Sequence, residues 1–417
     1  MKKMILMLVL TGLFVVSLAQ VSTVNFEANK IISTSRPDGR YLSTNGFVHQ
    51  QMRDLKPMLQ FDPNLSKNEF TRWQAKIRNK VWDLMQFPVV TPQPSPKLIS
   101  KVKRKGYTVE KWEVFPQDGN VVPILMLIPD GVSASSPAPA VLCYPGSYRS
   151  KEELAGEPEL EPKYKVERMY DKNHMAKFYA EKGFVAIAID NPGVAELSDL
   201  ERATTAPSYA RENFSRYLMD MGWHYMGYSA FNGHQILKWL RKLDFVDAKR
   251  LALSGHSLGT EPVMMLASLN PDIKAVVFND FLTNTIRRVI VSTKPNEKGV
   301  RPTQNGLIHC VPGLWRWADY VDILASLAPM HLLITEGGVT MDLKMVQKAY
   351  VIAGADKNFD YRYYKMYENA KDRIGDKAIP EGLDGNEFFR YANVDAPNHY
   401  FKADIAVPWL GNLLLNK

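Results

Sequence analysis

The sequence predicts an α/β protein with a mostly parallel sheet and helices on both faces of that sheet. From about residue 107 onward, short apolar runs typical of buried strands alternate with amphipathic helical segments. The first two runs, 107–115 and 121–128, flank Asp118-Gly119-Asn120, a turn sequence that predicts a β-hairpin. The chain has 417 residues, of which 46% are hydrophobic and 23% charged, so it is long enough to bury a large core.

Residues 1–19 have the pattern of a secretory signal peptide. Lys2 and Lys3 precede an apolar run over 4–16, and Ser17-Leu18-Ala19 places small residues at the cleavage positions. An uncleaved anchor is the alternative, but the run is shorter than the roughly 20 residues that a spanning helix needs. We therefore expect export to the periplasm or secretion, without stable membrane insertion.

Residues 20–104 are expected to form an N-terminal helical extension, and residues 105–417 the catalytic domain. Ser66 and Glu69 have the spacing of a capping box, and Pro88 ends the helix that follows. The proline-rich stretch 91–96 is typical of a linker or surface strap. The apolar residues that recur on one face of this helix are Trp73, Ile77, Val81, Leu84 and Met85.

The rest of the chain alternates strands and helices. Strands are expected at 138–144, 184–189, 250–254, 275–278 and 331–335, and helices at 175–182, 225–243, 261–269 and 343–353. Three long connections, 145–173, 192–223 and 282–327, would leave the carboxyl ends of parallel strands, where such sheets bind ligands. Loops of this length are usually lids or binding loops.

Gly255-His256-Ser257-Leu258-Gly259 matches the pattern G-x-S-x-G between an apolar strand and a helix. That context predicts a sharp turn that presents Ser257 as a nucleophile, with glycines where side chains would collide. The amide of Leu258 is then expected to donate to an oxyanion. The pattern alone is weak, because glycine-rich serine loops also occur as plain turns.

Serine needs a base, usually histidine, and in such folds the chain order is serine, acid, histidine. Of the eight histidines, His399 alone follows all candidate acids, and it lies in a polar turn before the terminal helix near 407–415. A surface turn histidine is the alternative. His256, inside the turn of the nucleophile, is expected to be structural.

The acid is less well defined by the sequence. It should follow the strand 331–335, and the common spacing G-x-x-D would place it at position 340, where this chain has Thr340. Glu336 at the strand end is favoured over Asp342, which could also be an ordinary residue at a helix start. Asp280 is a more distant third candidate. The acid would hold the imidazole tautomer and stabilise the imidazolium.

The loop after strand 138–144 begins Pro145-Gly146-Ser147, and Gly146 or Ser147 is expected to supply the second oxyanion donor. The third long connection carries Trp315, Arg316, Trp317 and Tyr320. Aromatic faces there could stack on sugar rings, and Arg316 could hold a carboxylate. Alternatively these aromatics only pack the connection onto the core.

The formal net charge is +8, and the basic residues are scattered rather than arranged with aromatics, so nucleic acid is not an expected partner. No ligand spacing such as H-E-x-x-H occurs, so we expect no metal and no cofactor. Cys143 and Cys310 could pair in an oxidising compartment, but Cys143 lies in an apolar strand where a free thiol is favoured. The oligomeric state stays open.

Five stretches together resemble the acetyl xylan esterase and dienelactone hydrolase branch of the α/β-hydrolase superfamily. The likeness is greatest to esterase-like proteins associated with SusD/RagB-type polysaccharide uptake. It implies an α/β-hydrolase fold and hydrolysis of small-molecule or oligosaccharide esters, with acetyl groups foremost, in the periplasm. Thr340 departs from the pattern and leaves the acid open. The stretches are 144–147, 190–193, 255–262, 335–338 and 398–401.

Two other functions are compatible with these residues. The same triad cleaves amides in serine peptidases, although no propeller-like repeat is present to gate peptides. A non-catalytic glycan-binding relic of a hydrolase is the second alternative, and the Ser257/His399 pair argues against it.

Overall fold

The computed structural model describes residues 38–41, 44–157, 170–198, 207–293, 306–376 and 378–416. The predicted signal peptide and residues 20–37 of the predicted extension lie outside this part. Within it, no helix has the length and apolar character needed to cross a membrane. Cys143 is buried and Cys310 half-buried, and both are free thiols.

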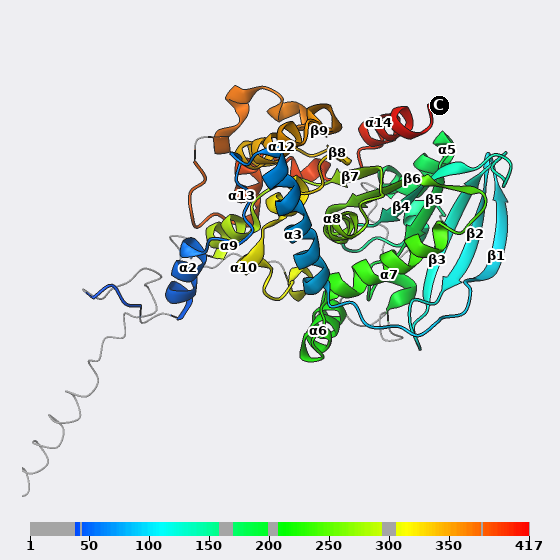
Figure 1. The fold of residues 1–417 in the computed structure, drawn as a ribbon, viewed down its shortest axis with the longest axis horizontal. Helices are drawn as coiled ribbons and strands as arrows, with labels where there is room; N and C mark the ends of the chain where they lie inside the picture. Colours follow the sequence, from blue (N-terminus) through cyan, green and yellow to red (C-terminus); the bar gives the residue numbers. More distant parts are fainter. Residues whose placement is uncertain are drawn as a thin grey trace, which may run out of the picture.

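The centre of the protein is one nine-stranded sheet with the order β1-β2-β3-β5-β4-β6-β7-β8-β9 (Figure 1). Strands β1, β2, β3 and β5 pair antiparallel, and the pairs from β5–β4 to β8–β9 are parallel. This confirms the predicted mostly parallel sheet that begins with a hairpin. The strands are β1 (Lys97–Arg104), β2 (Tyr107–Val114), β3 (Val122–Pro129), β4 (Ala138–Tyr144), β5 (Val185–Ile189), β6 (Val246–His256), β7 (Ala275–Asn279), β8 (His331–Ile334) and β9 (Phe359–Tyr361).

Helices cover both faces of the sheet. Because successive side chains of a strand point to opposite faces, they belong to two separate hydrophobic cores. Leu142 and Leu253 belong to the core under α3, α7, α8, α11 and α12, whereas Val141 and Ala252 face α4, α5 and α14. Figure 1 shows α14 and α5 together, away from α3 and α7. These helices are α3 (Lys67–Met85), α4 (Lys151–Ala155), α5 (Met175–Lys182), α7 (Tyr225–Leu240), α8 (Thr260–Leu269), α11 (Tyr320–Ala325), α12 (Thr340–Ala353) and α14 (Ala403–Leu414).

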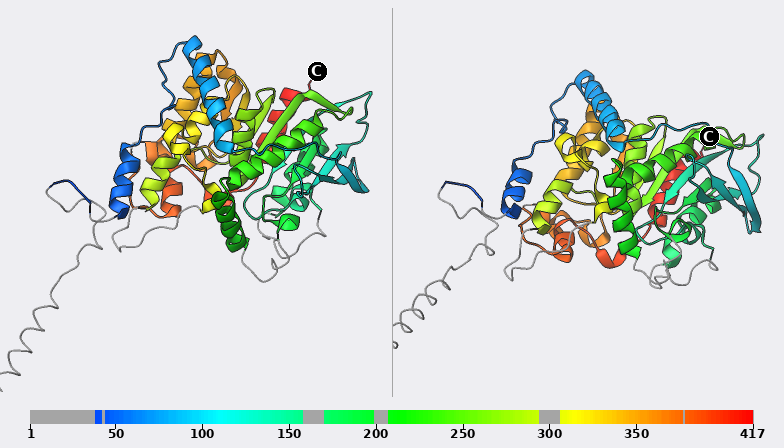
Figure 2. Two further views of the ribbon diagram at one scale, coloured as in Figure 1. Left: turned by 60° about the horizontal axis from the view of Figure 1, so that its bottom comes forward. Right: turned by 90° about the horizontal axis from the view of Figure 1, so that it is seen from below.

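The predicted helix of the N-terminal extension is α3, and both halves of its capping box are present at Ser66 and Glu69. Its apolar face joins the same core as α7 and α8, where Ile77 and Met85 are fully buried. Figure 2 shows α3 alongside the helices of the main domain, and it contacts α12 as well. The extension is thus packed into the core through this face.

The predicted boundary at residue 104 is wrong for the sheet, because strand β1 lies inside the predicted helical extension. Its register with β2 places Val102 opposite Val109 and Arg104 opposite Tyr107. All eight residues of β1 are exposed. A strand at the sheet edge with no buried face leaves no apolar alternation in the sequence, which is the signal that reveals other strands.

The described parts of the long connections contain helices, among them α4 in the first. The second contains α6 (Pro207–Asp220), and the third contains α9 (Thr285–Thr293), α10 (Leu314–Trp317) and α11. Together with α2 (Thr44–Asp54) and α13 (Gly385–Tyr391), α9 and α10 lie on the β9 side of the sheet in Figure 1, whereas α6 lies apart from them, below α7. The candidate site lies at the carboxyl ends of β6, β7 and β8.

Candidate active site

Ser257 follows β6 directly and has the left-handed φ of 51° that a sharp strand-to-helix turn imposes. A Cβ at Gly255 would lie 2.5 Å from the carbonyl oxygen of Gly259, and one at Gly259 would lie 2.5 Å from that of Tyr144. Both distances are far below contact, so only glycine fits at either position. The predicted turn and the predicted reason for its glycines are confirmed.

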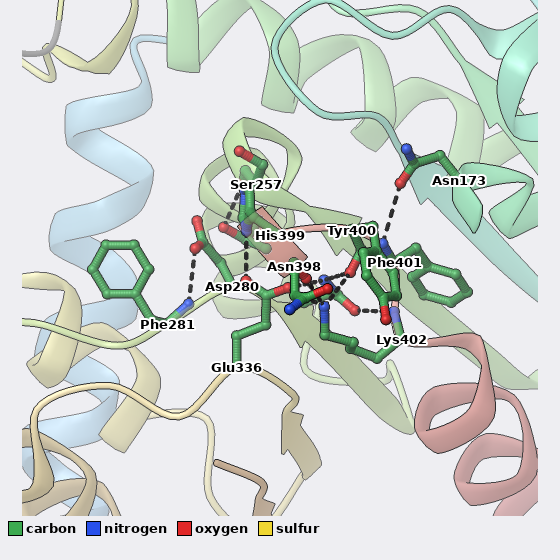
Figure 3. Close-up of polar contacts among 12 residues, drawn as sticks. Asn173, Ser257, Asp280, Phe281, Glu336, Asn398, His399, Tyr400, Phe401 and Lys402 are labelled. Atoms are coloured by element: carbon green, nitrogen blue, oxygen red, sulfur yellow. Dashed lines mark hydrogen bonds and ion pairs between the residues drawn. The ribbon is translucent and has the colours of Figure 1, made fainter. Parts of the chain in front are cut away.

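His399 lies in the loop before α14, and its ring is oriented by Glu336 at the end of β8 (Figure 3). His399 Nδ1 is 2.5 Å from Glu336 Oε2, a short charge-assisted hydrogen bond. The ring of His256, which precedes Ser257, lies 4.8 Å from the His399 ring. The structure therefore brings the nucleophile turn, the histidine and one carboxylate together.

The charged side chains of this site shift one another's pKa values strongly. Burial alone would raise the pKa of Glu336, but the charge and hydrogen bond of His399 and the ammonium of Lys402 outweigh it, and the pKa is lowered. Burial lowers the pKa of His399, but Glu336 and Asp280 raise it to about 9. Burial, together with the charge of His399, holds the pKa of His256 well below its usual range. His256 is thus a neutral packing residue, as the sequence indicated.

Lys402 is a member of the site that the sequence did not reveal. Its Nζ lies 3.0 Å from Glu336 Oε1, so the carboxylate meets His399 on one oxygen and an ammonium on the other. The same ammonium donates to the carbonyls of Asn398 and Tyr400 in the histidine loop. Glu336 is fully buried, and Lys402 is only 7% exposed. A buried carboxylate needs such partners to stay ionised.

Asn279 at the end of β7 fixes the same loop. Its Nδ2 donates to Glu336 Oε1 at 3.3 Å and to the Tyr400 carbonyl at 3.2 Å. Its Oδ1 accepts from the backbone amide of Lys402 at 2.7 Å. One side chain thus ties the acid to the two residues Tyr400 and Lys402 that follow His399 in its loop, which limits movement of His399 relative to Glu336.

Asn191 fixes the direction of two carbonyls in the loop after β4. Asn191 Nδ2 donates to the carbonyls of Pro145 and Gly146 at 2.9 and 3.0 Å. In a trans peptide the N–H points opposite to the C=O, so the amides of Gly146 and Ser147 point away from Asn191. Within the described residues, the amides of Ser147 and Leu258 make no hydrogen bond. Both stay available as oxyanion donors.

The other candidate acids do not reach the histidine. Asp342, at the start of α12, accepts from Arg287 Nη1 at 2.7 Å and from the Asn284 amide at 2.8 Å. These contacts pair Asp342 with α9 rather than with His399, and its role in catalysis stays a prediction. Asp280 lies near His399 but accepts from the Phe281 amide at 2.8 Å (Figure 3). Thr340 hydrogen-bonds Tyr363 instead.

A pocket of about 600 Å³ lies beside the triad, lined in part by Thr260 and Asp280. Of the predicted substrate-binding residues, Trp315, Arg316 and Tyr320 line it. Trp317 does not, because its ring packs under Lys80 of α3, with Nζ 4.0 Å from the ring centroid. For Trp317 the alternative of simple packing holds.

The ligand atoms of His256, Glu336 and His399 lie within 4.8 Å of one another, a spacing that could hold a metal ion. The hydrogen bond between His399 and Glu336 already occupies two of these atoms. A cation there would also face the Lys402 ammonium at Glu336 Oε1. The donor set is therefore a poor fit for a metal.

A nucleophile turn after β6, an acid after β8 and a histidine before the last helix define an α/β hydrolase. The chain matches the model of the Abhydrolase family over residues 24–412, and it belongs to that family.

A protein of Bacteroides fragilis NCTC 9343, named for a suggested acetyl xylan esterase activity, is 41% identical, with a TM-score of 0.85. The match covers 92% of this chain and 98% of that one. A methylesterase (15% identity, TM-score 0.49, 77% and 63% covered) and a glucuronoyl esterase from Solibacter usitatus (14%, 0.46, 68% and 81%) are much less similar. The comparison with curated proteins gave no match.

Proposed function

We propose that the protein is a serine carboxylic-ester hydrolase that removes acyl groups, acetyl foremost, from carbohydrate. The observation that carries the proposal is the 2.5 Å contact between His399 Nδ1 and Glu336 Oε2 beside the Ser257 turn. It fixes the tautomer in which Nε2 is free to take a proton. The 41% identical protein named as an acetyl xylan esterase supports the substrate class.

In the proposed reaction, Ser257 Oγ attacks the ester carbonyl while His399 Nε2 takes its proton. The tetrahedral oxyanion is held by the amides of Leu258 and of Gly146 or Ser147, each worth about 3 kcal/mol. His399 then protonates the leaving alcohol, and water repeats the sequence to release the acid. Ser257 Oγ makes no hydrogen bond to a described residue here, and such contacts often tighten only with substrate bound.

The test is ester turnover by the mature protein and by a Ser257→Ala variant. We expect the wild type to hydrolyse p-nitrophenyl acetate and to release acetate from acetylated xylo-oligosaccharides, and the variant to show only background rates. A circular dichroism spectrum and melting temperature like those of the wild type would show that the variant is folded. Equal turnover by both proteins would refute the assignment of Ser257.

We further propose that the protein is exported and acts in the periplasm or outside the cell. Lys2, Lys3 and the apolar run over 4–16 support this. Expression of the full chain, followed by N-terminal sequencing of the periplasmic protein, tests it. A mature chain that starts near residue 20 is expected, and an intact Met1 in the cytoplasmic fraction would contradict the proposal.

A further inference from the structure

The pocket beside the triad contains a guanidinium that meets no acceptor in the described part of the chain. Arg288, on α9, is half-buried and lines the pocket. Its guanidinium carbon lies 5.3 Å from the ring centroid of Phe281, with Phe388 and Phe389 at 5.9 and 6.0 Å. No hydrogen bond or ion pair with a described residue satisfies its five N–H donors.

The neighbouring Arg287, on the same helix, has a structural role, because a buried carboxylate pairs with its guanidinium. Arg287 Nη1 lies 2.7 Å from Asp342 Oδ2, a buried carboxylate. Arg288 instead has three aromatic rings within 6.0 Å of its guanidinium carbon, and it lines the pocket together with one of them, Phe281. Aromatic faces hold a guanidinium in place without using its N–H groups. The aromatic rings thus hold the guanidinium in place, and its fork of N–H donors is free to bind a ligand in the pocket.

Arg288 also lies on the triad side of the pocket. Burial raises the pKa of Asp280 to about 6, and the charges of His399 and Arg288 both act against that rise. The geometry agrees, because Arg288 packs on Phe281, whose backbone amide donates to Asp280, and Asp280 and Arg288 line the same pocket. A ligand group held by Arg288 would therefore lie in the same pocket as Asp280, which neighbours His399 (Figure 3).

Other residues that line the pocket suit sugar hydroxyls. Glu261, in the first turn of α8, is hydrogen-bonded by His309 Nδ1 at 2.7 Å and by the Tyr320 hydroxyl at 3.0 Å. The carboxylate is thereby engaged and does not compete for Arg288. Trp315 adds a half-buried aromatic face, fixed by its Nε1 hydrogen bond to Thr285 Oγ1 at 3.0 Å. Polar groups and a flat aromatic wall together are typical of carbohydrate sites.

We propose that Arg288 binds an anionic substituent, a carboxylate, on the glycan next to the ester, so that the preferred substrates are acyl esters of uronic-acid-containing carbohydrate. The inference rests on the proposed esterase function and specifies its substrate. A planar fork of N–H donors matches a carboxylate in a bidentate contact. A sulfate ester on the sugar offers the same oxygen chemistry, and the test separates the two.

The substrates are matched pairs of soluble glycosides. Methyl glucoside and methyl glucosiduronate, each with one acetyl group at the same ring position, differ only in the C6 group, which is neutral or anionic. A 6-sulfated methyl glucoside with the same acetyl group forms the third arm. We expect kcat/KM to be about tenfold higher for the uronate than for the neutral sugar, which corresponds to one charge-assisted hydrogen-bonding contact. The sulfate should fall between them.

The variant is Arg288→Met, which keeps the length of the stem and removes the fork. The uronate-to-neutral ratio of kcat/KM should then fall to about one, and because the ratio is read, any general loss of activity cancels. Arg288→Lys keeps the charge but not the fork, so it should retain part of the preference. Arg316→Met is the matched control, because Arg316 lines the same pocket but is exposed, and it should lower the ratio less.

Three outcomes would overturn the inference: no uronate preference in the wild type, an unchanged ratio in Arg288→Met, or a larger loss in Arg316→Met than in Arg288→Met. A preference for the sulfated sugar over the uronate would overturn the choice of carboxylate. If none of these esters and no p-nitrophenyl acetate is hydrolysed, the proposed function itself fails, which is a separate result.

Discussion

The ammonium of Lys402 lies 3.0 Å from Glu336 Oε1, on the oxygen that His399 does not use. Glu336 therefore lies between two cationic partners and is itself fully buried. Without the lysine, the Glu336 charge would raise the pKa of His399 further, so a smaller fraction of the ring would be neutral at a given pH. The positive charge of Lys402 offsets part of the effect of the Glu336 carboxylate on His399.

Replacing Lys402 by Met should raise the pKa of His399, because the Lys402 charge lowers that pKa in the native site. At a given pH a smaller fraction of the imidazole is then neutral, so the acid limb of the kcat/KM profile moves to higher pH. The measurement is the pH profile for p-nitrophenyl acetate. Lys402→Arg should restore most of the profile. If Lys402→Met only lowered the melting temperature, with an unmoved limb, the lysine would be merely structural.

The wild-type profile has its own expected form. Glu336 and Asp280 raise the pKa of His399 to about 9 against the opposing effect of burial. The protonated ring cannot accept the serine proton, so kcat/KM should rise with pH through a midpoint above the ordinary imidazole value of about 6.5. A midpoint at or below that value would show that the Glu336 contact is weaker than the structure has it.

Glu336→Gln and Asp342→Asn separate the two carboxylates that the sequence left open. Glu336→Gln should lower kcat by about 10³-fold or more, since an amide favours the wrong imidazole tautomer. Asp342→Asn should leave kcat nearly unchanged but lower the free energy of unfolding by about 1–3 kcal/mol, because Arg287 loses its charged partner. Urea unfolding and steady-state kinetics on both variants provide the comparison. The reverse pattern would exchange their roles.

Asn191→Ala should impair the oxyanion loop without touching the triad. The variant frees the carbonyls of Pro145 and Gly146, so the Gly146 and Ser147 amides lose their fixed direction. One oxyanion donor is worth about 10²–10³ in kcat, and we expect a loss of about tenfold or more with a smaller change in KM. Asn358→Ala is the control, because Asn358 binds the Pro329 carbonyl at an exposed position. Equal effects in both variants would refute a role for Asn191 in catalysis.

The parts of the site that the sequence predicts are those set by local pattern or chain order. The turn around Ser257 is recognisable because strand, glycines and helix are consecutive, and His399 because the base must follow the acid. The strands with a buried face can be predicted because their apolar residues form a local pattern in the sequence. Strand β1 is not, because both of its faces are exposed.

The supporting residues are invisible in the sequence because their roles depend on contacts between distant segments. No neighbouring residue in the sequence indicates that Lys402 is buried, because its partner Glu336 follows strand β8, far away along the chain. Asn191 and Asn279 act through backbone carbonyls and amides of other loops, which no motif encodes. The open guanidinium of Arg288 differs from the paired one of Arg287 only in which way each faces on α9.

Ser257 is the proposed nucleophile, and covalent labelling measures its activation most directly. The mature protein is treated with a fluorophosphonate probe and its peptides are mapped by mass spectrometry. We predict a single adduct on Ser257, which becomes much slower to form in His399→Ala. Adduct formation without ester turnover would favour a peptidase. A protein that takes up no probe, or takes it up on another residue, would contradict the account and favour a glycan-binding role.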